Sequence, residues 1–203
     1  GKNLVGAFHP PKFVLIDPKL LSTLPVKELK NGMGEVVKHA IIDSPHLLEL
    51  CQKDWHNSPA EQVQFISEAL AVKVKMVQLD PFEKGIRAAL NLGHTVGHAV
   101  ELLSDFQLPH GYAVAIGMVA EARLAQHVGM VDQKFVNQLV TILQQSGLPT
   151  EIPQTIDKHK IIETMKLDKK NSGKQIRFAL PKAVGQVEVG VVIDDLETIF
   201  AKL

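Results

Sequence analysis

Most of the chain shows the three- and four-residue spacing of apolar side chains that is typical of amphipathic helices. One stretch differs, because it is rich in Ala, Val, Ile and Met and carries few charges, which predicts a helix buried on most sides. It runs from Gly111 to Val128. The other predicted helices cover Met33–Ile42, Pro45–Leu50, Pro59–Gln78, a stretch that starts between Ile86 and Asn91 and ends at Leu103, Val131–Gln145, Asp157–Leu167, and a last helix after Asp194.

Three helix starts carry a strong local signal. Asp17, Ser44 and Ser58 each stand directly before a proline, and a short polar side chain followed by proline is a favoured way to begin a helix. Ser58 is also followed three residues later by Glu61, which completes a capping box. The pattern therefore predicts that a helix begins at each of the three prolines.

Strand signals lie near the two ends of the chain. Phe13–Ile16 is a short apolar run and predicts a strand. Ile176–Leu180 and Val187–Val192, joined through Gly185, predict a hairpin. The predicted fold class is therefore mainly α, with a short N-terminal strand and a C-terminal β-hairpin.

Composition narrows the possible partners and compartments. The 203 residues are 45% hydrophobic and carry 22 basic and 22 acidic side chains. A core can therefore form, and no charge excess points to a nucleic acid or a membrane surface. No run approaches the roughly 18 apolar residues of a transmembrane helix, and no signal peptide is evident. The single cysteine, Cys51, cannot form an internal disulfide, which favours a cytoplasmic location.

One stretch gathers polar side chains that bind ligands. On a continuous helix these side chains fall within an arc of about 60°. A solvated helix surface is the simpler interpretation, but such surfaces favour Lys, Glu and Gln, whereas Arg, Asn and His bind ligands and metals. Glycines at 93 and 97 let another backbone or a ligand approach closely. The four polar residues are Arg87, Asn91, His94 and His98.

Two further residues are candidate metal ligands. His110 precedes the predicted buried helix, where it needs a partner. Glu35 lies among small and apolar residues, where an unpaired carboxylate is costly. Lys38 could satisfy Glu35 as an ion pair, and a metal could satisfy it equally well. His94 and His98 have the spacing of zinc-protease helices, but threonine follows His94 where that motif requires glutamate.

Five segments stand out as motifs. They are Gly1–Phe8, Gly32–Lys38, Asn91–Glu101, His110–Met118, and Asp168–Lys170 with the hairpin that follows. In this order and at this spacing they resemble the 3-dehydroquinate synthase family, and the resemblance covers the whole chain. It implies a two-domain enzyme that binds NAD in an N-terminal domain and a metal, zinc or cobalt, in a helical C-terminal domain. The implied metal ligands are Glu35, His94 and His110.

The resemblance also implies the reaction. In that family, 3-deoxy-D-arabino-heptulosonate 7-phosphate is converted to 3-dehydroquinate and phosphate, a carbon–oxygen lyase step of the shikimate pathway to the aromatic amino acids. NAD oxidises one hydroxyl transiently, phosphate is eliminated, and the ring opens and recloses. Family members are commonly homodimers. A metal with three protein ligands keeps a position open for the substrate.

The remaining site residues follow from the same resemblance. A substrate with a carboxylate and a phosphate needs fixed cations and amide donors. The implied substrate contacts are Lys38, Lys73, Arg87, Asn91 and one or both of Lys169 and Lys170. The implied proton-transfer residues are Glu83 and His98, and Lys38 also counts among the catalytic residues. The implied cofactor contacts are Lys2, Asn3 and Thr23.

The chain departs from the family at three points. Tyr112 stands where glutamate is common after the His-Gly pair, and Gly34 stands where alanine is common beside the metal glutamate. No glycine-rich dinucleotide fingerprint occurs. We therefore interpret residues 1–17 as the tail end of an absent NAD-binding domain and residues 18–203 as the helical metal- and substrate-binding domain, which is expected to be inactive alone.

Three alternatives stay open. The chain could belong to a related sugar-phosphate cyclase of secondary metabolism, with the same metal site and a different sugar. It could also belong to a metal-dependent alcohol or glycerol dehydrogenase, although such enzymes act on small uncharged alcohols and need fewer cations. The third alternative is a non-catalytic helical module, which a failure to bind metal would favour.

Overall fold

The computed structural model describes residues 5–7, 9, 11–53, 58–170 and 175–202, except for the side chains of residues 168–170 and 202. Most of the described chain is helical, which confirms the mainly α prediction. Two elements, η1 and η2, are short 3-10 helices. In chain order the elements are η1 (Pro18–Thr23), α1 (Val26–Asp43), α2 (Pro45–Leu50), α3 (Pro59–Leu79), η2 (Ile86–Asn91), α4 (His94–Leu103), α5 (His110–His127), α6 (Gln133–Gln145), α7 (Lys158–Lys170), β1 (Phe178–Ala183), β2 (Gln186–Val191) and α8 (Leu196–Lys202).

Local capping explains the helix starts that the sequence predicts. The Asp17, Ser44 and Ser58 side chains accept a backbone N–H from two or three residues further on, at 3.0, 3.1 and 3.3 Å respectively. All three predicted starts are confirmed. By contrast, α1 begins at Val26, well before the predicted Met33. The sequence does not mark this start, because Pro25 precedes it and offers no side-chain cap.

The predicted strand at Phe13–Ile16 is wrong. No strand forms there, and Phe13 and Leu15 are 82% and 86% exposed. A strand requires a neighbouring strand to pair with its backbone groups. Among the described residues the only sheet is the antiparallel hairpin of β1 and β2, so this apolar run has no partner.

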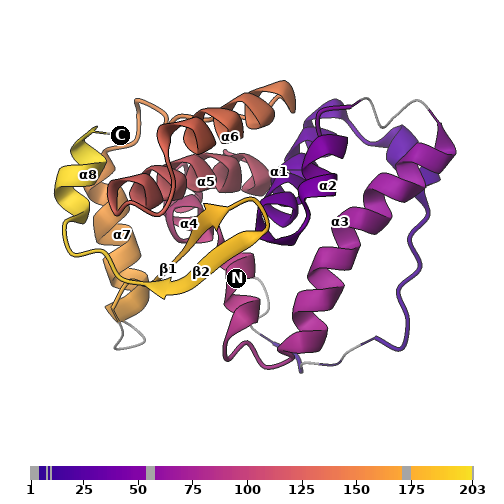
Figure 1. The fold of residues 1–203 in the computed structure, drawn as a ribbon, viewed down its shortest axis with the longest axis horizontal. Coiled ribbons are helices and arrows are strands. Elements are labelled where there is room, and N and C mark those ends of the chain that lie inside the picture. The colour runs from indigo at the N-terminus through magenta and orange to yellow at the C-terminus, as the bar shows by residue number, and fades with distance from the viewer. Residues whose placement is uncertain (1–4, 8, 10, 54–57, 171–174, 203) are drawn as a thin grey trace.

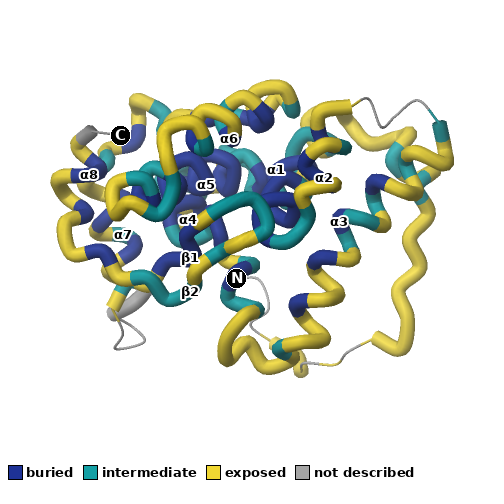
Figure 2. Tube along the Cα trace, viewed as in Figure 1, coloured by how far each residue is buried: buried dark blue, intermediate teal, exposed yellow. Residues whose placement is uncertain are grey.

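The core surrounds α5, which lies at the centre of the main body with α4, α6 and the hairpin around it (Figure 1). Two hydrophobic clusters meet on this helix, one shared with α1, α2, α3 and α6 and the other with α4, α7 and α8. Figure 2 shows α5 buried along most of its length. The predicted buried helix is therefore confirmed.

The hairpin confirms the predicted C-terminal β structure. Its turn is tied to α1, because the Gly185 N–H donates to the Ile41 carbonyl at 2.9 Å. Gly185 has φ +83°, a left-handed conformation that glycine adopts without strain. No helix in the described part of the chain has the length and hydropathy needed to cross a bilayer.

Candidate metal and anion site

Glu35 is placed by a close crossing of α1 and α5. A Cβ atom on Gly34 would collide with the backbone of Gly111, so the two backbones touch where α5 begins. The Gly111 N–H also donates to the Asn31 side chain at 2.7 Å. This contact fixes Glu35, the residue after Gly34, beside His110 at the start of α5. Gly34 therefore fits the tight crossing seen in this chain.

His94 and His98 lie on α4, but the continuous helix predicted through Arg87 and Asn91 is wrong. The chain forms η2 up to Asn91 and then turns at Gly93, which has φ +76°. His94 is the first residue of α4. The four polar residues still gather in one region. They do so because of the turn at Gly93 between η2 and α4, and not because they share one helical face.

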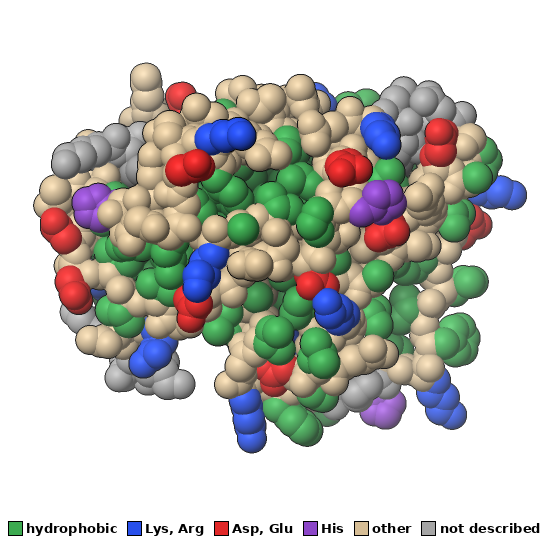
Figure 3. All heavy atoms as spheres, in the orientation of Figure 1, with side chains coloured by type: hydrophobic (Ala, Val, Ile, Leu, Met, Phe, Trp, Pro, Cys, Tyr) green, Lys and Arg blue, Asp and Glu red, His purple; other side chains and the backbone are tan. Residues whose placement is uncertain are grey.

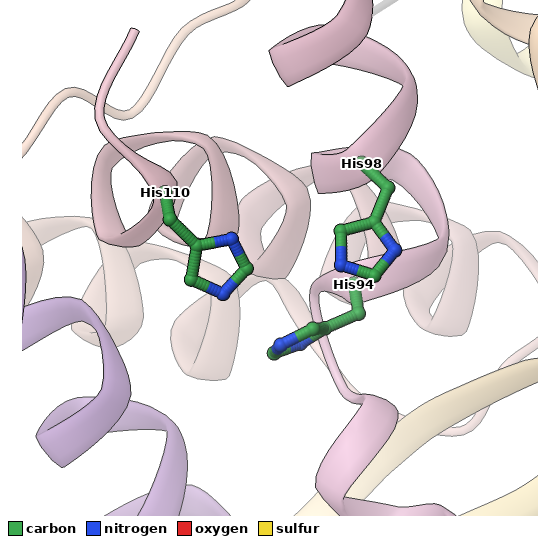
Figure 4. A group of neighbouring side chains, drawn as sticks. All are labelled: His94, His98 and His110. Carbon is green, nitrogen blue, oxygen red and sulfur yellow. The ribbon is translucent and has the colours of Figure 1, made fainter. Parts of the chain in front are cut away.

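His110 is the first residue of α5 and follows Pro109. Its Nδ1 atom lies 3.2 Å from Oε2 of Glu101, near the end of α4. Figure 4 shows the rings of His94, His98 and His110 converging on one space from α4 and α5. The sequence pattern alone gives no reason for this meeting, because the two helices must fold back on each other to produce it.

Three side chains face one point in the arrangement expected of metal ligands. Nε2 of His94 and Nε2 of His110 lie 3.5 and 3.6 Å from the same carboxylate oxygen, Oε1 of Glu35. That oxygen is buried and has no hydrogen-bond partner, a situation that normally costs about 1–3 kcal/mol. One carboxylate and two imidazoles are a donor set that suits zinc or cobalt. The residues present therefore fit a divalent cation.

The second nitrogen of each ligand histidine is already engaged. Nδ1 of His94 lies 3.1 Å from the Leu92 carbonyl, and Nδ1 of His110 faces Glu101. A hydrogen bond from Nδ1 leaves Nε2 with its lone pair free for a metal, and such partners orient ligand histidines in metalloproteins. In both histidines, Nε2 is thus the nitrogen that faces Glu35 and can bind a metal.

His98 offers a competing ligand set. Donor nitrogens of His94, His98 and His110 all lie within 4.8 Å of one another. The ring centroids of His94 and His98 are 5.1 Å apart. We favour Glu35 over His98 as the third ligand, because the three-histidine set would leave the buried Glu35 oxygen without a partner.

Electrostatics keep Glu35 and His94 in metal-binding forms. Burial raises the pKa of the Glu35 carboxyl, but His110, Lys38 and His94 outweigh burial and hold that pKa well below its usual range. Burial, together with the Lys38 charge, lowers the pKa of His94 to about 4. The contact with Glu35 raises the pKa of His110, and Glu101 adds to that shift. Glu35 is therefore ionised and His94 neutral at pH 7.

A cavity of about 320 Å³ opens beside these ligands. Lys38, Lys73 and Arg87 bring three cations to it, and the Lys38 ammonium donates to Oε2 of Glu35 at 2.7 Å. This cation-lined cavity therefore collects most of the predicted site residues, which come from α1, α3, η2, α4, α5 and the turn before η2. Those on its wall are Glu35, Lys38, Lys73, Glu83, Arg87, Asn91, His94 and His110.

The turn before η2 is organised by Asp80, which sequence analysis missed. Its carboxylate accepts the backbone N–H groups of Lys84 and Gly85 at 2.9 and 2.7 Å. These hydrogen bonds hold the pKa of Asp80 below its usual range. Glu83 within this turn has φ +53°, and its Oε1 accepts from the Asn91 amide at 3.2 Å. An Asp before such a turn is the signal that could have identified it.

Several predicted site residues are not brought to this cavity. His98 lines a neighbouring cavity of about 310 Å³ that also touches Asn91 and His94. Thr23 ends η1 and donates to the Leu20 carbonyl at 3.3 Å, and it does not line the cation-lined cavity. Four predicted contacts lie outside the described residues or side chains: Lys2, Asn3, Lys169 and Lys170.

Tyr112 does not take the place of an acidic partner for His110. It is half-buried and packs against the first hydrophobic cluster, while the described partner of His110 Nδ1 is Glu101. Sequence analysis named Glu101 only as the last residue of the motif Asn91–Glu101. It missed Glu121 entirely, because a single acid inside an apolar helix has no local signature.

The fold and the site together are those of a helical domain that sets a carboxylate–histidine cluster beside a cation-lined cavity. The chain belongs to the 3-dehydroquinate synthase family. The family model described as 3-dehydroquinate synthase C-terminal matches residues 32–171, and the one described as 3-dehydroquinate synthase N-terminal matches residues 1–31.

Relatives named 3-dehydroquinate synthase support this assignment. The chain is 43% identical over 196 residues to that of Synechococcus sp., which covers 93% of this chain and 53% of the relative. It is 41% identical over 205 residues to that of Xanthomonas campestris, which covers 96% and 55%. The chain thus spans about half the length of the curated relatives it matches.

Two solved structures share the fold. One is 2-epi-5-epi-valiolone synthase from Streptomyces hygroscopicus with NAD+ and Zn2+ bound, with a TM-score of 0.86, 24% identity, and coverage of 98% of this chain and 57% of that chain. The other is 2-deoxy-scyllo-inosose synthase complexed with carbaglucose-6-phosphate, NAD+ and Co2+, with a TM-score of 0.81, 27% identity, and coverage of 99% and 59%.

Proposed function

We propose that this chain is the metal- and substrate-binding half of a 3-dehydroquinate synthase, which converts 3-deoxy-D-arabino-heptulosonate 7-phosphate to 3-dehydroquinate and phosphate. The observation that carries the proposal is the buried Oε1 of Glu35, which has no hydrogen-bond partner and faces Nε2 of both His94 and His110. The relatives that bear this enzyme name support the choice of reaction.

Glu35, His94 and His110 would hold the metal, zinc or cobalt. A bound divalent cation supplies Lewis-acid polarisation of substrate hydroxyls, which lowers their pKa. Three protein ligands leave a coordination position for those hydroxyls. The chain's own contribution is orientation, since Leu92 and Glu101 fix the ring nitrogens and Lys38 holds the second oxygen of Glu35.

The cations of the cavity would bind the anionic groups of the substrate. Lys73 and Arg87 lie on its wall with the Asn91 amide, and guanidinium and ammonium groups pair with carboxylate or phosphate. Lys38 is almost fully buried and paired with Glu35, so it would act next to the metal. Lys169 and Lys170 follow along α7 as further proposed contacts.

Two groups would transfer protons. Glu83 holds the Asn91 amide and lies near Arg87, with its Oε2 at 3.9 Å from Nε. A carboxylate at the rim of the cavity can accept a proton from a bound hydroxyl. His98 lines the neighbouring cavity, which shares the walls of Asn91 and His94 with the first. It can therefore reach a substrate that extends past the metal.

The rest of the full-length enzyme remains part of the proposal. NAD would be bound mainly by the N-terminal half, with Lys2, Asn3 and Thr23 as contacts from this chain and residues 1–17 as the end of that half. We also propose a cytoplasmic lyase that works as a homodimer, with no nucleic acid or membrane partner. The balanced charge of the chain supports the last point.

The test restores a family-length protein by joining the chain to the N-terminal half of the Synechococcus relative. With NAD and zinc, the fusion should release phosphate and 3-dehydroquinate from the heptulosonate phosphate, and Glu35→Gln should abolish the release. The chain alone should show no turnover. A folded fusion that binds zinc but releases no phosphate would contradict the proposed reaction.

A binding measurement serves if the fusion fails to fold. Calorimetric titration of the zinc-loaded chain with the heptulosonate phosphate should show binding that Arg87→Gln weakens at least tenfold. Ser22→Ala, on the exposed surface of η1, is the matched control and should bind like wild type. Equal binding by the Arg87 variant would contradict the proposed substrate contact.

A related sugar-phosphate cyclase is the second candidate, and the likeness to 2-deoxy-scyllo-inosose synthase complexed with carbaglucose-6-phosphate favours it. The test is a panel of sugar phosphates offered to the same fusion. Turnover of another sugar phosphate, with none of the heptulosonate phosphate, would replace the first candidate by the second.

A further inference from the structure

The two proposed ligand histidines occupy equivalent places in a pair of helices. His94 is the first residue of α4 and His110 is the first residue of α5. The helices pack so closely that a Cβ atom on Gly117 would collide with the Gly93 carbonyl. They run in opposite directions, because the start of α4 lies against the middle of α5 and the end of α4 lies against the start of α5.

Each helix lends a glutamate to the start of the other. Glu121 from α5 reaches the start of α4, where its Oε2 accepts the Gly93 N–H at 2.6 Å and its Oε1 accepts the Val96 N–H at 3.2 Å. Glu101 from α4 reaches the start of α5, where its Oε2 lies 3.2 Å from Nδ1 of His110. Glu121 therefore contacts backbone groups within two residues of His94, and Glu101 contacts the ring of His110 itself.

Glu121 is a costly residue in its position. It is fully buried among the apolar side chains of α5, and an isolated carboxylate there would be strongly destabilising. Burial raises the pKa of Glu121 to about 8, against the effect of the backbone N–H groups. Each of its two oxygens accepts a backbone N–H group, and these hydrogen bonds offset part of the cost of burial. The carboxylate supplies the cap that α4 lacks, since Gly93 has no side chain.

Glu101 acts on the ring of His110 and not on the backbone. A carboxylate on Nδ1 holds the N–H on that nitrogen and presents the lone pair of Nε2 to the metal, and it also raises the basicity of the ring. The two glutamates therefore differ in chemistry. Glu121 fixes the position of the backbone that carries His94. Glu101 fixes which ring nitrogen of His110 faces the metal.

We propose that Glu101 and Glu121 form a reciprocal carboxylate clamp that holds the starts of α4 and α5, and with them His94 and His110, at the separation one metal ion requires. The two glutamates are positioning residues, and neither is assigned a metal bond. This inference rests on the proposed metal centre, because the clamp has a function only if His94 and His110 share an ion.

The clamp can be tested with Glu121→Gln and Glu101→Gln in the full 203-residue chain. Glutamine keeps the size of the side chain, but its amide would point N–H toward N–H at Gly93 or Val96. Leu124→Ala is the matched control, since Leu124 is fully buried in the same helix and its loss destabilises α5 without removing either hydrogen bond that Glu121 makes at the start of α4. Glu163→Gln, on the surface of α7, controls for the loss of one charge.

Three readouts separate positioning from general stability. Zinc affinity, measured by competition with a chelator, should fall at least tenfold in each Gln variant and stay within twofold in both controls. The visible spectrum of the cobalt-loaded chain should change in the Gln variants alone. In the metal-free chain, amide exchange at Gly93 and Val96 should quicken in Glu121→Gln but not in Leu124→Ala.

The outcomes distinguish the clamp from the metal centre. If wild type binds zinc and the Gln variants bind it equally with unchanged cobalt spectra, the clamp is overturned and the metal centre stands. If wild type binds no zinc or cobalt, the metal centre falls, and the clamp falls with it as a device for positioning ligands. Loss of affinity in Leu124→Ala to the same extent as in Glu121→Gln would also overturn the clamp, because destabilisation alone would then explain the loss.

Discussion

Helices α5 and α3 are similar in length and opposite in environment. Helix α5 is buried over most of its 18 residues, whereas α3, with 21 residues, buries only Phe65, Ala69, Val72 and Met76. In Figure 1, α3 extends along one side of the molecule, with the N-terminal segment outside it. Figure 3 shows hydrophobic side chains at the surface in that part of the molecule.

The difference divides the site between a rigid part and an exposed part. His94 and His110 stand on the closely packed α4 and α5, and Glu35 is tied to them by the crossing at Gly34. Lys73 comes from the exposed face of α3. Packing density limits how far a side chain can shift, so the structure fixes the metal ligands more firmly than this substrate contact. The two regions should therefore respond differently to substitution.

The largest effect is expected where the ligands sit in the rigid region. His94→Ala and Glu35→Gln should each weaken zinc binding at least 1000-fold, about 4 kcal/mol, because two remaining ligands cannot hold the ion. His98→Ala should keep the zinc with a change of less than tenfold. Elemental analysis and chelator competition measure all three. Zinc loss in His98→Ala with retention in Glu35→Gln would assign the third ligand to His98.

A backbone substitution probes the rigid region directly. Gly117→Ala should lower the free energy of unfolding by about 3 kcal/mol, because its Cβ collides with the Gly93 carbonyl and forces α4 and α5 apart. Gly32→Ala in α1 meets nothing within 4 Å and should instead stabilise by up to about 1 kcal/mol. Urea unfolding measures both. Equal effects of the two substitutions would contradict the close α4–α5 contact.

His39 lies where α1 meets α3, and its protonation makes the stability of the chain depend on pH. Burial, together with the Lys38 charge, lowers the pKa of His39 to about 4 from its usual 6.5. The unfolded chain therefore binds the extra proton between pH 6.5 and 4, so stability falls as pH drops through that range. The loss is on the order of 3 kcal/mol and is complete below pH 4.

The variant His39→Gln tests this assignment. Urea unfolding of wild type and variant should be compared at pH 7 and pH 4.5. The wild type should lose more stability than the variant between these two values. An identical loss in both would show that His39 does not titrate in this range, and other buried groups such as His94 would then account for the acid sensitivity.

The smallest effect is expected on the exposed face of α3. Val74 is 49% exposed, so Val74→Ser should change the free energy of unfolding of the chain by no more than about 0.5 kcal/mol. Val72→Ser, two residues away and buried, should cost at least about 2 kcal/mol. A large loss in Val74→Ser would mean that another surface covers this face of α3 in solution.

Local signals in the sequence predict much of the fold. The caps at Ser44 and Ser58 mark α2 and α3 because the capping residue lies next to the helix it starts. The apolar composition of α5 predicts its burial for a similar reason. The start of α1 was missed because Pro25 offers no side-chain cap, and the strand at Phe13–Ile16 fails because a strand depends on a partner that a local pattern cannot supply.

The sequence predicts which residues form the candidate site but not how they are arranged. Glu35, His94 and His110 emerge from the sequence because each needs a partner or matches a family motif. The break at Gly93 was missed, since the polar spacing from Arg87 to His98 looks the same with or without it. The roles of Glu101 and Glu121 depend on contacts between two helices, which only the folded chain reveals.

The central claim is that Glu35, His94 and His110 together hold one divalent cation. The most direct test is a crystal structure of the zinc-loaded chain, with anomalous scattering used to locate the metal. The account predicts one zinc bonded to a Glu35 oxygen and to Nε2 of both histidines, at about 2.0–2.2 Å. A zinc bonded to His98 in place of Glu35, or no zinc at this position, would contradict it.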